Sequence, residues 1–377
     1  MKHFRFFFLL QSLIWFCITP LCKAQIAINI VADTSDVHTQ SAIHFLERYL
    51  NDFGANNKTP DYSKYWSKAD CRHSSLPDNM VYSFASDVPT YTFGDHPTIF
   101  YAVAEKGLVH LKTLFASIDS NYNISPWAIT NHYVINEDGQ SRFISELELN
   151  KSAYQTIRNR NISYHFPEGV SFNKLHSDTM LSRLQKIEQE WGFEPIQMDY
   201  YYATTGAQLS RMRGLDFNFN MDRVDPSGIS YPDQRMLFCQ GLGEGYLHEV
   251  LHIYFNPRYK QSPLCHAMIY YLAGGIGHDF DWMINRMNAY LLKYPETDLG
   301  QYEKLQTKDP MLHIDYVVMG LLCKLIDEKD GINGLKRALQ YKTLDELLLA
   351  EFNLRTSGLD AYLKACIKNF ISEKRLK

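Results

Sequence analysis

The stretch 243-GEGYLHEVLHIYF-255 places two histidines, His248 and His252, four residues apart in a strongly apolar segment. The apolar and aromatic residues around the pair predict a buried helix, which the Asn-Pro pair at 256–257 is expected to end. Residues four apart lie on one face of a helix, so both imidazoles can reach a single ion. Glu249 stands one residue further on, within reach of a water molecule bound to that ion.

Histidine and glutamate at this spacing are suited to metal-assisted hydrolysis. Neutral imidazoles bind Zn²⁺ and leave one coordination position open, and the ion lowers the pKa of water bound there. A neighbouring carboxylate then takes the proton and delivers it to the leaving amine. The pattern therefore predicts zinc ligands at His248 and His252 and a general base at Glu249. The alternative interpretation is a buried helix whose two histidines are satisfied within the core.

The first 24 residues have the pattern of a secretory signal peptide. An apolar run follows two early basic residues, and the small residue Ala24 stands at the expected cleavage point. We therefore expect a secreted or periplasmic protein that begins near Gln25 and has no integral membrane segment. A retained anchor is disfavoured because the apolar run is short for a membrane span. Lipid attachment at Cys22 is disfavoured because Leu21, just before it, is larger than lipidation sites prefer.

Composition indicates a folded and mildly acidic protein of 377 residues, 45% of them hydrophobic. The net charge is −4, and it becomes −7 without the three basic residues of the signal peptide. This charge gives no electrostatic reason to expect nucleic acid or an anionic membrane as a partner. Five cysteines remain after the signal peptide, an odd number, and no two of them form a CxxC pair, so a cysteine zinc site is not expected. They are Cys71, Cys239, Cys265, Cys323 and Cys366.

The N-terminal part, residues 25–168, is predicted to be an α+β domain. Residues 26–31 are strand-like, and apolar residues at helical spacing predict a helix over 37–54. Between 90 and 165 the period changes to two, and the turn "NEDGQ" within that stretch predicts a hairpin. This order of elements resembles the nuclear transport factor 2-like cone fold over about 130 residues. The resemblance implies a ligand pocket or a dimer, and a packing or interaction domain is the alternative.

The second part, residues 169–377, is expected to begin after a boundary near 165–174 and to contain a small sheet and a helical C-terminal half. Before the HEVLH helix, the pattern predicts a helix over 171–191, strands over 195–204 and 235–241, and a loop over 222–234. After that helix, it predicts helices over 262–273, 280–293, 311–328, 332–340, 344–352 and 358–374.

This order of elements around HEVLH resembles the gluzincin, or peptidase MA-like, catalytic domain over residues 171–377. "YYYATTGAQLSRMRGLDF" is similar to its first strand and helix, and "DYVVMGLLCKLIDEKDGINGLKRAL" to a later segment. The resemblance implies a zinc peptidase that acts on peptide or protein substrates. It implies zinc ligands at His248 and His252, a general base at Glu249 and an oxyanion donor at Tyr316. Burial of Tyr316 in the core, without a catalytic role, is the alternative.

The chain departs from the gluzincin pattern at the third zinc ligand. Gluzincins take this ligand from a glutamate on the next helix, and the matching position in "SPLCHAMIYYLAGG" is Ala267. The residue that should follow it, a glycine, is Met268, and no glutamate occurs between Glu249 and Glu296. A metzincin-type third histidine is also missing, because Arg258 stands six residues after the second histidine.

Three alternatives remain for the third ligand. His266, next to the lost position, would complete a three-histidine site if the helix were shifted in register. His278, Asp279 or Asp281 could instead supply the ligand from the following loop. In the third alternative the site binds metal weakly or not at all. The chain is then a binding or scaffold module on a peptidase fold, or a ligand-binding protein that works through its N-terminal domain.

Overall fold

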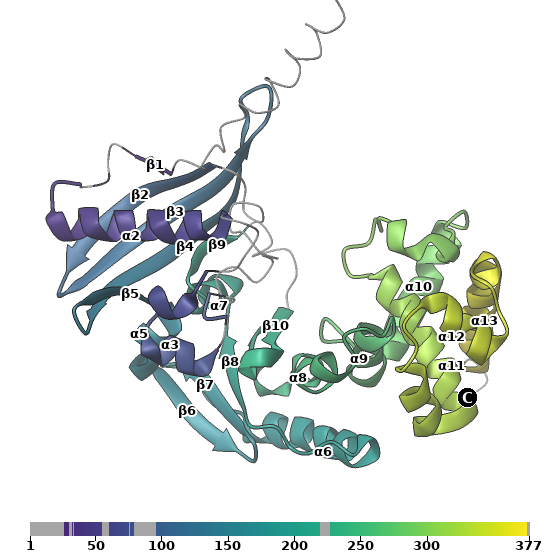
Figure 1. Cartoon of the computed structure of the whole chain (residues 1–377). Coiled ribbons are helices and arrows are strands. Elements are labelled where there is room, and N and C mark those ends of the chain that lie inside the picture. Colours follow the sequence, from purple (N-terminus) through teal and green to yellow (C-terminus); the bar gives the residue numbers. More distant parts are fainter. Residues whose placement is uncertain are drawn as a thin grey trace, which may run out of the picture. The chain divides into compact units, whose positions relative to one another are not determined.

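The computed structural model describes residues 26–29, 32, 34–54, 60–74, 76–78, 96–218 and 227–374 (Figure 1). The predicted signal peptide and the expected start at Gln25 lie outside the described residues. The chain forms two compact units, Met1–Leu149 with Arg211–Phe219, and Asn150–Ser210 with Asn220–Lys377. Helices and two mixed sheets are combined in the fold, which confirms the predicted α+β class. Within these ranges, no helix is both long enough and apolar enough to cross a membrane.

The sheet of the first unit has the order β1-β2-β3-β4-β5, and β9 pairs with the part of β4 that β5 leaves free. Its strands are β1 (Ala27–Ile28), β2 (His96–Glu105), β3 (Leu108–Ile118), β4 (Ile124–Glu137), β5 (Gln140–Ile144) and β9 (Leu215–Asn218). The hairpin predicted from "NEDGQ" is confirmed, because β4 and β5 pair antiparallel around this turn. Asp138 and Gly139 adopt φ values of 53° and 80° there, as tight hairpin turns require.

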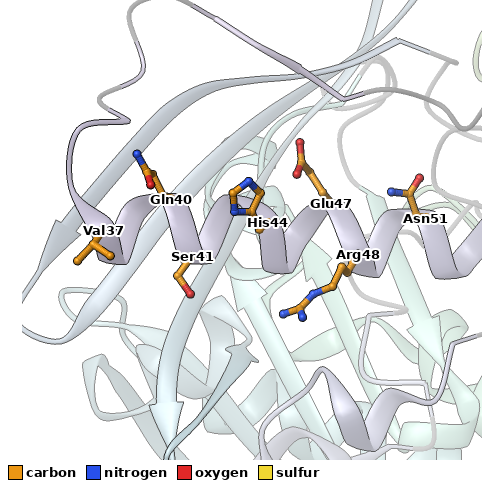
Figure 2. Close-up of a pocket in the computed structure, with 7 residues that line it drawn as sticks. All are labelled: Val37, Gln40, Ser41, His44, Glu47, Arg48 and Asn51. Carbon is orange, nitrogen blue, oxygen red and sulfur yellow. The ribbon is translucent and has the colours of Figure 1, made fainter.

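Helix α2 (Val37–Gly54) confirms the predicted helix over 37–54 and packs against β2 and β3. Its apolar stripe joins the core of the unit: the rings of Phe45 and Tyr49 lie 4.7 and 5.0 Å from that of Phe143. Figure 2 shows seven residues of its outer side, whose side chains spread apart rather than converge. This side therefore has the character of a solvated helix surface. The unit also contains η2 (Tyr62–Lys64), α3 (Lys68–His73) and α5 (Glu146–Leu149).

The sheet of the second unit has the order β10-β11-β8-β7-β6. Its strands are β6 (Tyr154–Asn159), β7 (Ile162–Pro167), β8 (Met198–Ala203), β10 (Ser227–Tyr231) and β11 (Met236–Gln240). The three central strands run parallel, and the two outer strands pair antiparallel with their neighbours. Helix α6 (Lys174–Trp191) lies between β7 and β8 in the chain and ends at Gly192, whose φ of 71° is left-handed. This end confirms the stop that the sequence predicts.

The division of the chain differs from the predicted boundary near 168. The sequence pattern predicts β6 and β7 in the N-terminal sheet, whereas the structure places them in the second sheet. The rings of Tyr164 and Phe166 on β7 lie 5.0 and 5.1 Å from those of Tyr200 and Tyr202 on β8. A period of two indicates a strand but not its partner, because pairing depends on tertiary packing. For the same reason the sequence did not reveal that β9 pairs with β4.

Strand β10 corrects a second prediction, since 222–234 was expected to be a loop. Residues Ser227–Tyr231 pair antiparallel with β11 over five positions. The segment is rich in Gly, Ser and Pro, and it lacks the apolar alternation from which strands are predicted. It forms a strand because it pairs with the edge of β11, and a local sequence pattern does not reveal such pairing. Between β10 and β11 lies the short helix η4 (Pro232–Gln234).

The C-terminal half is helical, as predicted. Its elements are η5 (Gly243–Gly245), α8 (Leu247–Tyr259), α9 (Cys265–Ala273), α10 (Phe280–Lys293), η6 (Leu299–Lys304), α11 (Ile314–Ala338), α12 (Leu344–Phe352) and α13 (Leu359–Lys374). The two helices predicted over 311–328 and 332–340 are the two parts of α11. They are separated by a kink at Gly331, whose φ of 61° and ψ of −155° are not helical. The predicted break is therefore present as a kink. Helices α8, α9 and α11 pack together and carry the candidate site.

Candidate metal centre

Helix α8 is buried along most of its length, which explains its apolar sequence. Every residue from Leu247 to Phe255 is buried, including the three polar residues of HEVLH. The predicted end at Asn256-Pro257 is wrong, because the helix continues to Tyr259 with Pro257 inside its last turn. Pro257 removes one intrahelical hydrogen bond there, and the final turn tolerates this loss better than the middle of a helix would.

A buried carboxylate fixes the approach to α8. Glu244, in the Gly-rich turn before the helix, accepts hydrogen bonds from the Asn173 backbone N–H at 2.6 Å and the Tyr202 hydroxyl at 2.8 Å. Tyr200 donates to the Gly243 carbonyl at 2.6 Å. These contacts join the turn to β8 and to the start of α6. The glycines of this turn therefore serve the backbone path, and Glu244 anchors it.

The imidazoles of His248 and His252 face each other through their Nε2 atoms, which are 3.2 Å apart. His248 Nδ1 lies 2.5 Å from the carbonyl oxygen of Gly274, which can only accept a hydrogen bond. Nδ1 of His248 must therefore carry the proton, and Nε2 of the neutral ring is bare. This tautomer is the one that a metal-binding histidine needs.

His252 is oriented in the same way by Asn256. Its Nδ1 lies 3.2 Å from Asn256 Oδ1, and the Cys265 thiol lies 3.6 Å from the same oxygen. An amide oxygen accepts, so Nδ1 of His252 also carries the proton and Nε2 is again bare. Asn256 thus links α8 to Cys265, the first residue of α9.

Two bare nitrogens that face each other repel unless a cation lies between them. Burial lowers the pKa of His248 well below its ordinary value and that of His252 to about 4, so both rings are neutral near pH 7. Two ligands of a tetrahedral zinc ion with bonds of about 2.0–2.1 Å are about 3.3 Å apart. The observed 3.2 Å matches this separation. The pair could therefore hold a divalent cation.

The structure brings His266 to this pair from the start of α9. Its ring centroid lies 4.6 Å from that of His252 and 6.2 Å from that of His248, and one ligand atom from each of the three lies within 4.8 Å of the others. Among the described residues these three form the one close group of metal-ligating side chains. Ala267, the position that the gluzincin resemblance aligns with glutamate, is buried in the core instead. His266, and not Ala267, therefore lies beside the pair.

The loop alternatives for the third ligand have other contacts. His278 stacks on Trp282 with ring centroids 3.7 Å apart. Asp279 caps α10 by accepting a hydrogen bond from the Trp282 backbone N–H at 2.8 Å. Neither residue, nor Asp281, belongs to the group of close ligands around His248.

Glu249 is buried beside β10, the strand that the sequence did not predict. Ser230 Oγ donates to Glu249 Oε2 at 2.5 Å and contacts its carbonyl oxygen at 2.8 Å. Gly228 permits this approach, because a Cβ there would lie 2.5 Å from Glu249 Cγ. Burial raises the pKa of Glu249 to about 7. The carboxyl group can thus exchange a proton near neutral pH, as a general base must.

Aromatic side chains surround the imidazoles. Tyr270 lies against His248 with ring centroids 4.6 Å apart, and Tyr316 lies 4.5 Å from both His266 and Tyr270. Tyr316, the predicted oxyanion donor, is half-buried, and burial raises the pKa of its hydroxyl. It therefore remains protonated near pH 7 and can donate a hydrogen bond. Its ring contacts the candidate third ligand directly.

Comparisons with known proteins add no family assignment. No model of a protein family matches the chain, and no curated protein matches it. The functional interpretation consequently depends on the geometry of the site. The structure brings together the residues that the sequence singled out, which are His248, Glu249, His252, His266 and Tyr316. The residues of β10 and the Asn256 contact were not predicted from the sequence. The Asn256 contact could have been predicted, because Asn256 stands four residues after His252 on the same face of the helix.

Proposed function

We propose that this chain is an exported zinc-dependent metallopeptidase, with His248, His252 and His266 as zinc ligands and Glu249 as general base. The observation that carries the proposal is the pair of bare Nε2 atoms 3.2 Å apart, each with its Nδ1 hydrogen-bonded. Three histidines are a viable ligand set for catalytic zinc, with the fourth position open to water. The layout around α8 supports the gluzincin resemblance, with histidine in place of the expected glutamate.

The roles of the residues follow from their surroundings. A bound zinc ion would supply an acidified water molecule as nucleophile. Glu249 would accept the proton of the attacking water and pass it to the leaving amine, and Ser230 donates a hydrogen bond that holds the carboxylate in place. The Tyr316 hydroxyl donates to the oxygen of the scissile carbonyl as negative charge develops there. Burial of His248, Glu249 and His252 strengthens the electrostatic interactions that these three residues make.

The decisive experiment is the metal content of the purified protein, wild type against His248→Ala. We expect near-stoichiometric zinc in the wild type and its loss in the variant, with circular dichroism showing that both are folded. Absence of zinc from a folded wild type, even after incubation with excess zinc, would overturn the metal site.

Peptidase activity needs its own test. We expect chelator-sensitive hydrolysis of a mixed peptide library, restored by added zinc and abolished in Glu249→Gln. The matched control is Glu244→Gln, which alters the neighbouring buried carboxylate that holds the turn and not the metal-bound water. Zinc binding without any hydrolysis would instead favour a catalytically degenerate binding or scaffold module. The exposed position of His266, which no hydrogen bond holds among the described residues, favours this second candidate.

A further inference from the structure

The first unit contains a second group of interacting polar side chains, on the face of its sheet opposite to the α2 core. Along β3, Val109 and Leu111 are buried in that core, so His110 and Lys112 lie on the other face. The register places these two residues directly opposite Tyr133 and Asn131 of β4. Four polar side chains thus form two adjacent cross-strand pairs.

These side chains line a cavity of about 440 Å³ together with groups from three further elements. That volume lies within the roughly 300–1,000 Å³ of small-molecule sites. All of its lining residues belong to the first unit; they are His110, Lys112, Asn131, Tyr133, Glu146, Arg211 and Asp216. The lining carries two basic and two acidic side chains, so its formal charges balance.

Hydrogen bonds fix the floor of this cavity. Asp216 forms an ion pair with Lys112, and its other oxygen accepts from Asn131 Nδ2 at 3.0 Å. The amide is thereby oriented, and Asn131 Oδ1 lies 2.7 Å from His110 Nε2. Because an amide oxygen accepts, His110 Nε2 must donate the proton. In the neutral ring Nδ1 is then an open acceptor.

One wall of the cavity carries a cation without a partner. The guanidinium of Arg211 makes no hydrogen bond or ion pair with any residue that the structure describes, although Lys112 on the floor is paired. Its backbone is well fixed, because Gly214 N–H donates to the Arg211 carbonyl at 2.8 Å and Asn131 N–H donates to the Gly214 carbonyl at 2.8 Å. Arg211 is exposed and its guanidinium is unpaired among the described residues, so this group is available for a bidentate pair with a carboxylate.

The remaining wall supplies an anion. Glu146 accepts a hydrogen bond from the Tyr133 hydroxyl, and Tyr133 stacks on His110 with ring centroids 4.4 Å apart. The cavity thus offers a free guanidinium to an anionic group, and an imidazole nitrogen and a carboxylate to a group that donates hydrogen bonds. A ligand with one group of each kind adds no net charge to the balanced lining.

We propose that this cavity binds a free α-amino acid, whose carboxylate pairs with Arg211 and whose ammonium group donates to His110 Nδ1 and Glu146. The site shares no residue with the metal centre. Zinc binding and peptide hydrolysis are therefore not required for it, and His248→Ala should bind the amino acid as the wild type does.

Calorimetric titration of the purified protein tests the proposal. The probes are glycine and L-alanine, leucine, phenylalanine, glutamate and lysine at millimolar concentrations, because the side-chain preference is open. Three analogues of alanine test its two charged groups separately. Propanoate lacks the ammonium group, L-lactate has a hydroxyl in its place, and ethylamine lacks the carboxylate. We expect at least one amino acid to bind, and we expect the three analogues to bind at least about 10-fold more weakly than alanine.

Two variants locate the site. Arg211→Gln should weaken binding about 10- to 100-fold, since it removes a charge-assisted pair of hydrogen bonds, and Arg211→Lys should be intermediate. Arg48→Gln is the control, because Arg48 is an exposed arginine of the same unit that extends from α2 (Figure 2). Thermal unfolding should show that all variants are folded. No binding to the wild type, equal binding of propanoate or lactate, or unchanged affinity in Arg211→Gln would each overturn the proposal.

Discussion

Helices α8 and α9 both bring histidine to the candidate metal centre, but they hold it in different ways. The two histidines of α8, His248 and His252, are buried, and each has its Nδ1 bonded to an oxygen acceptor. His266 on α9 is exposed, and the rings of Tyr316, His252 and Tyr270 pack against it. The first helix therefore presents a preorganised pair, and the second presents a ligand that can adjust its position.

This difference has an energetic consequence. A ligand already fixed in its binding geometry loses little conformational entropy when it binds an ion, whereas a free side chain must be ordered at that moment. The hydrogen-bonded tautomers of the α8 pair also raise the basicity of the bare nitrogens. We therefore expect α8 to supply most of the affinity for zinc, and α9 to set the coordination geometry.

Removal of one ligand from each helix tests this asymmetry directly. We expect His252→Ala to weaken zinc binding by about three orders of magnitude, or about 4 kcal/mol out of the roughly 10–16 kcal/mol of a structural zinc site. His266→Ala should weaken it only about 10- to 100-fold, because the preorganised pair remains. Competition with a fluorescent chelator measures both constants. Equal losses in the two variants would remove the distinction between the helices.

A second substitution separates the general base from the ligands on α8. Gly228→Ala places a Cβ 2.5 Å from Glu249 Cγ and 2.7 Å from the Tyr246 ring, so the glutamate must move. We expect kcat to fall about 10- to 100-fold, because displacement of a catalytic group by about 1 Å has that effect. Zinc content should not change, since no ligand is touched. Loss of zinc together with activity would show that β10 supports the whole site and not the base alone.

The sequence predicted α8 and its three polar residues well because a local pattern determines them. Two histidines at helical spacing in an apolar segment specify both the helix and the shared face. The contribution of β10 was not predictable in this way. Gly228 and Ser230 lie in a segment rich in turn formers, and they reach Glu249 only because that segment pairs with β11.

The candidate third ligand could not be singled out from the local sequence either. Alignment with the gluzincin pattern pointed to Ala267, and a shift of one residue around α9 decides which side chain faces the pair. That shift depends on how α9 packs on α8 and α11, where Ala267 and Met268 are buried. Sequence spacing alone therefore left His266 as one of three alternatives. The predicted domain boundary differed for a related reason, because strand partners are chosen by packing.

A third prediction concerns the residue that orients His252. Asn256→Leu removes the acceptor for Nδ1 and should weaken zinc binding about 10-fold, the lower end of the effect of such supporting contacts. Asn256→Asp keeps an acceptor at the same place and should bind zinc at least as tightly as the wild type. Chelator competition measures the zinc affinities of the two variants and shows whether the acceptor for Nδ1 matters. Equal weakening in both variants would indicate that Asn256 acts through helix packing and not through the tautomer of His252.

The smallest expected effect belongs to Tyr316, which links the two helices of the comparison to α11. Tyr316→Phe keeps the ring that contacts His266 and Tyr270 and removes only the hydroxyl. Zinc affinity should therefore stay within about twofold, because the ring contacts that position His266 are retained. We expect kcat to fall about 3- to 10-fold, less than for a dedicated oxyanion donor, because a bound metal ion also polarises the carbonyl. An unchanged kcat would show that Tyr316 has no role in catalysis and only packs against His266.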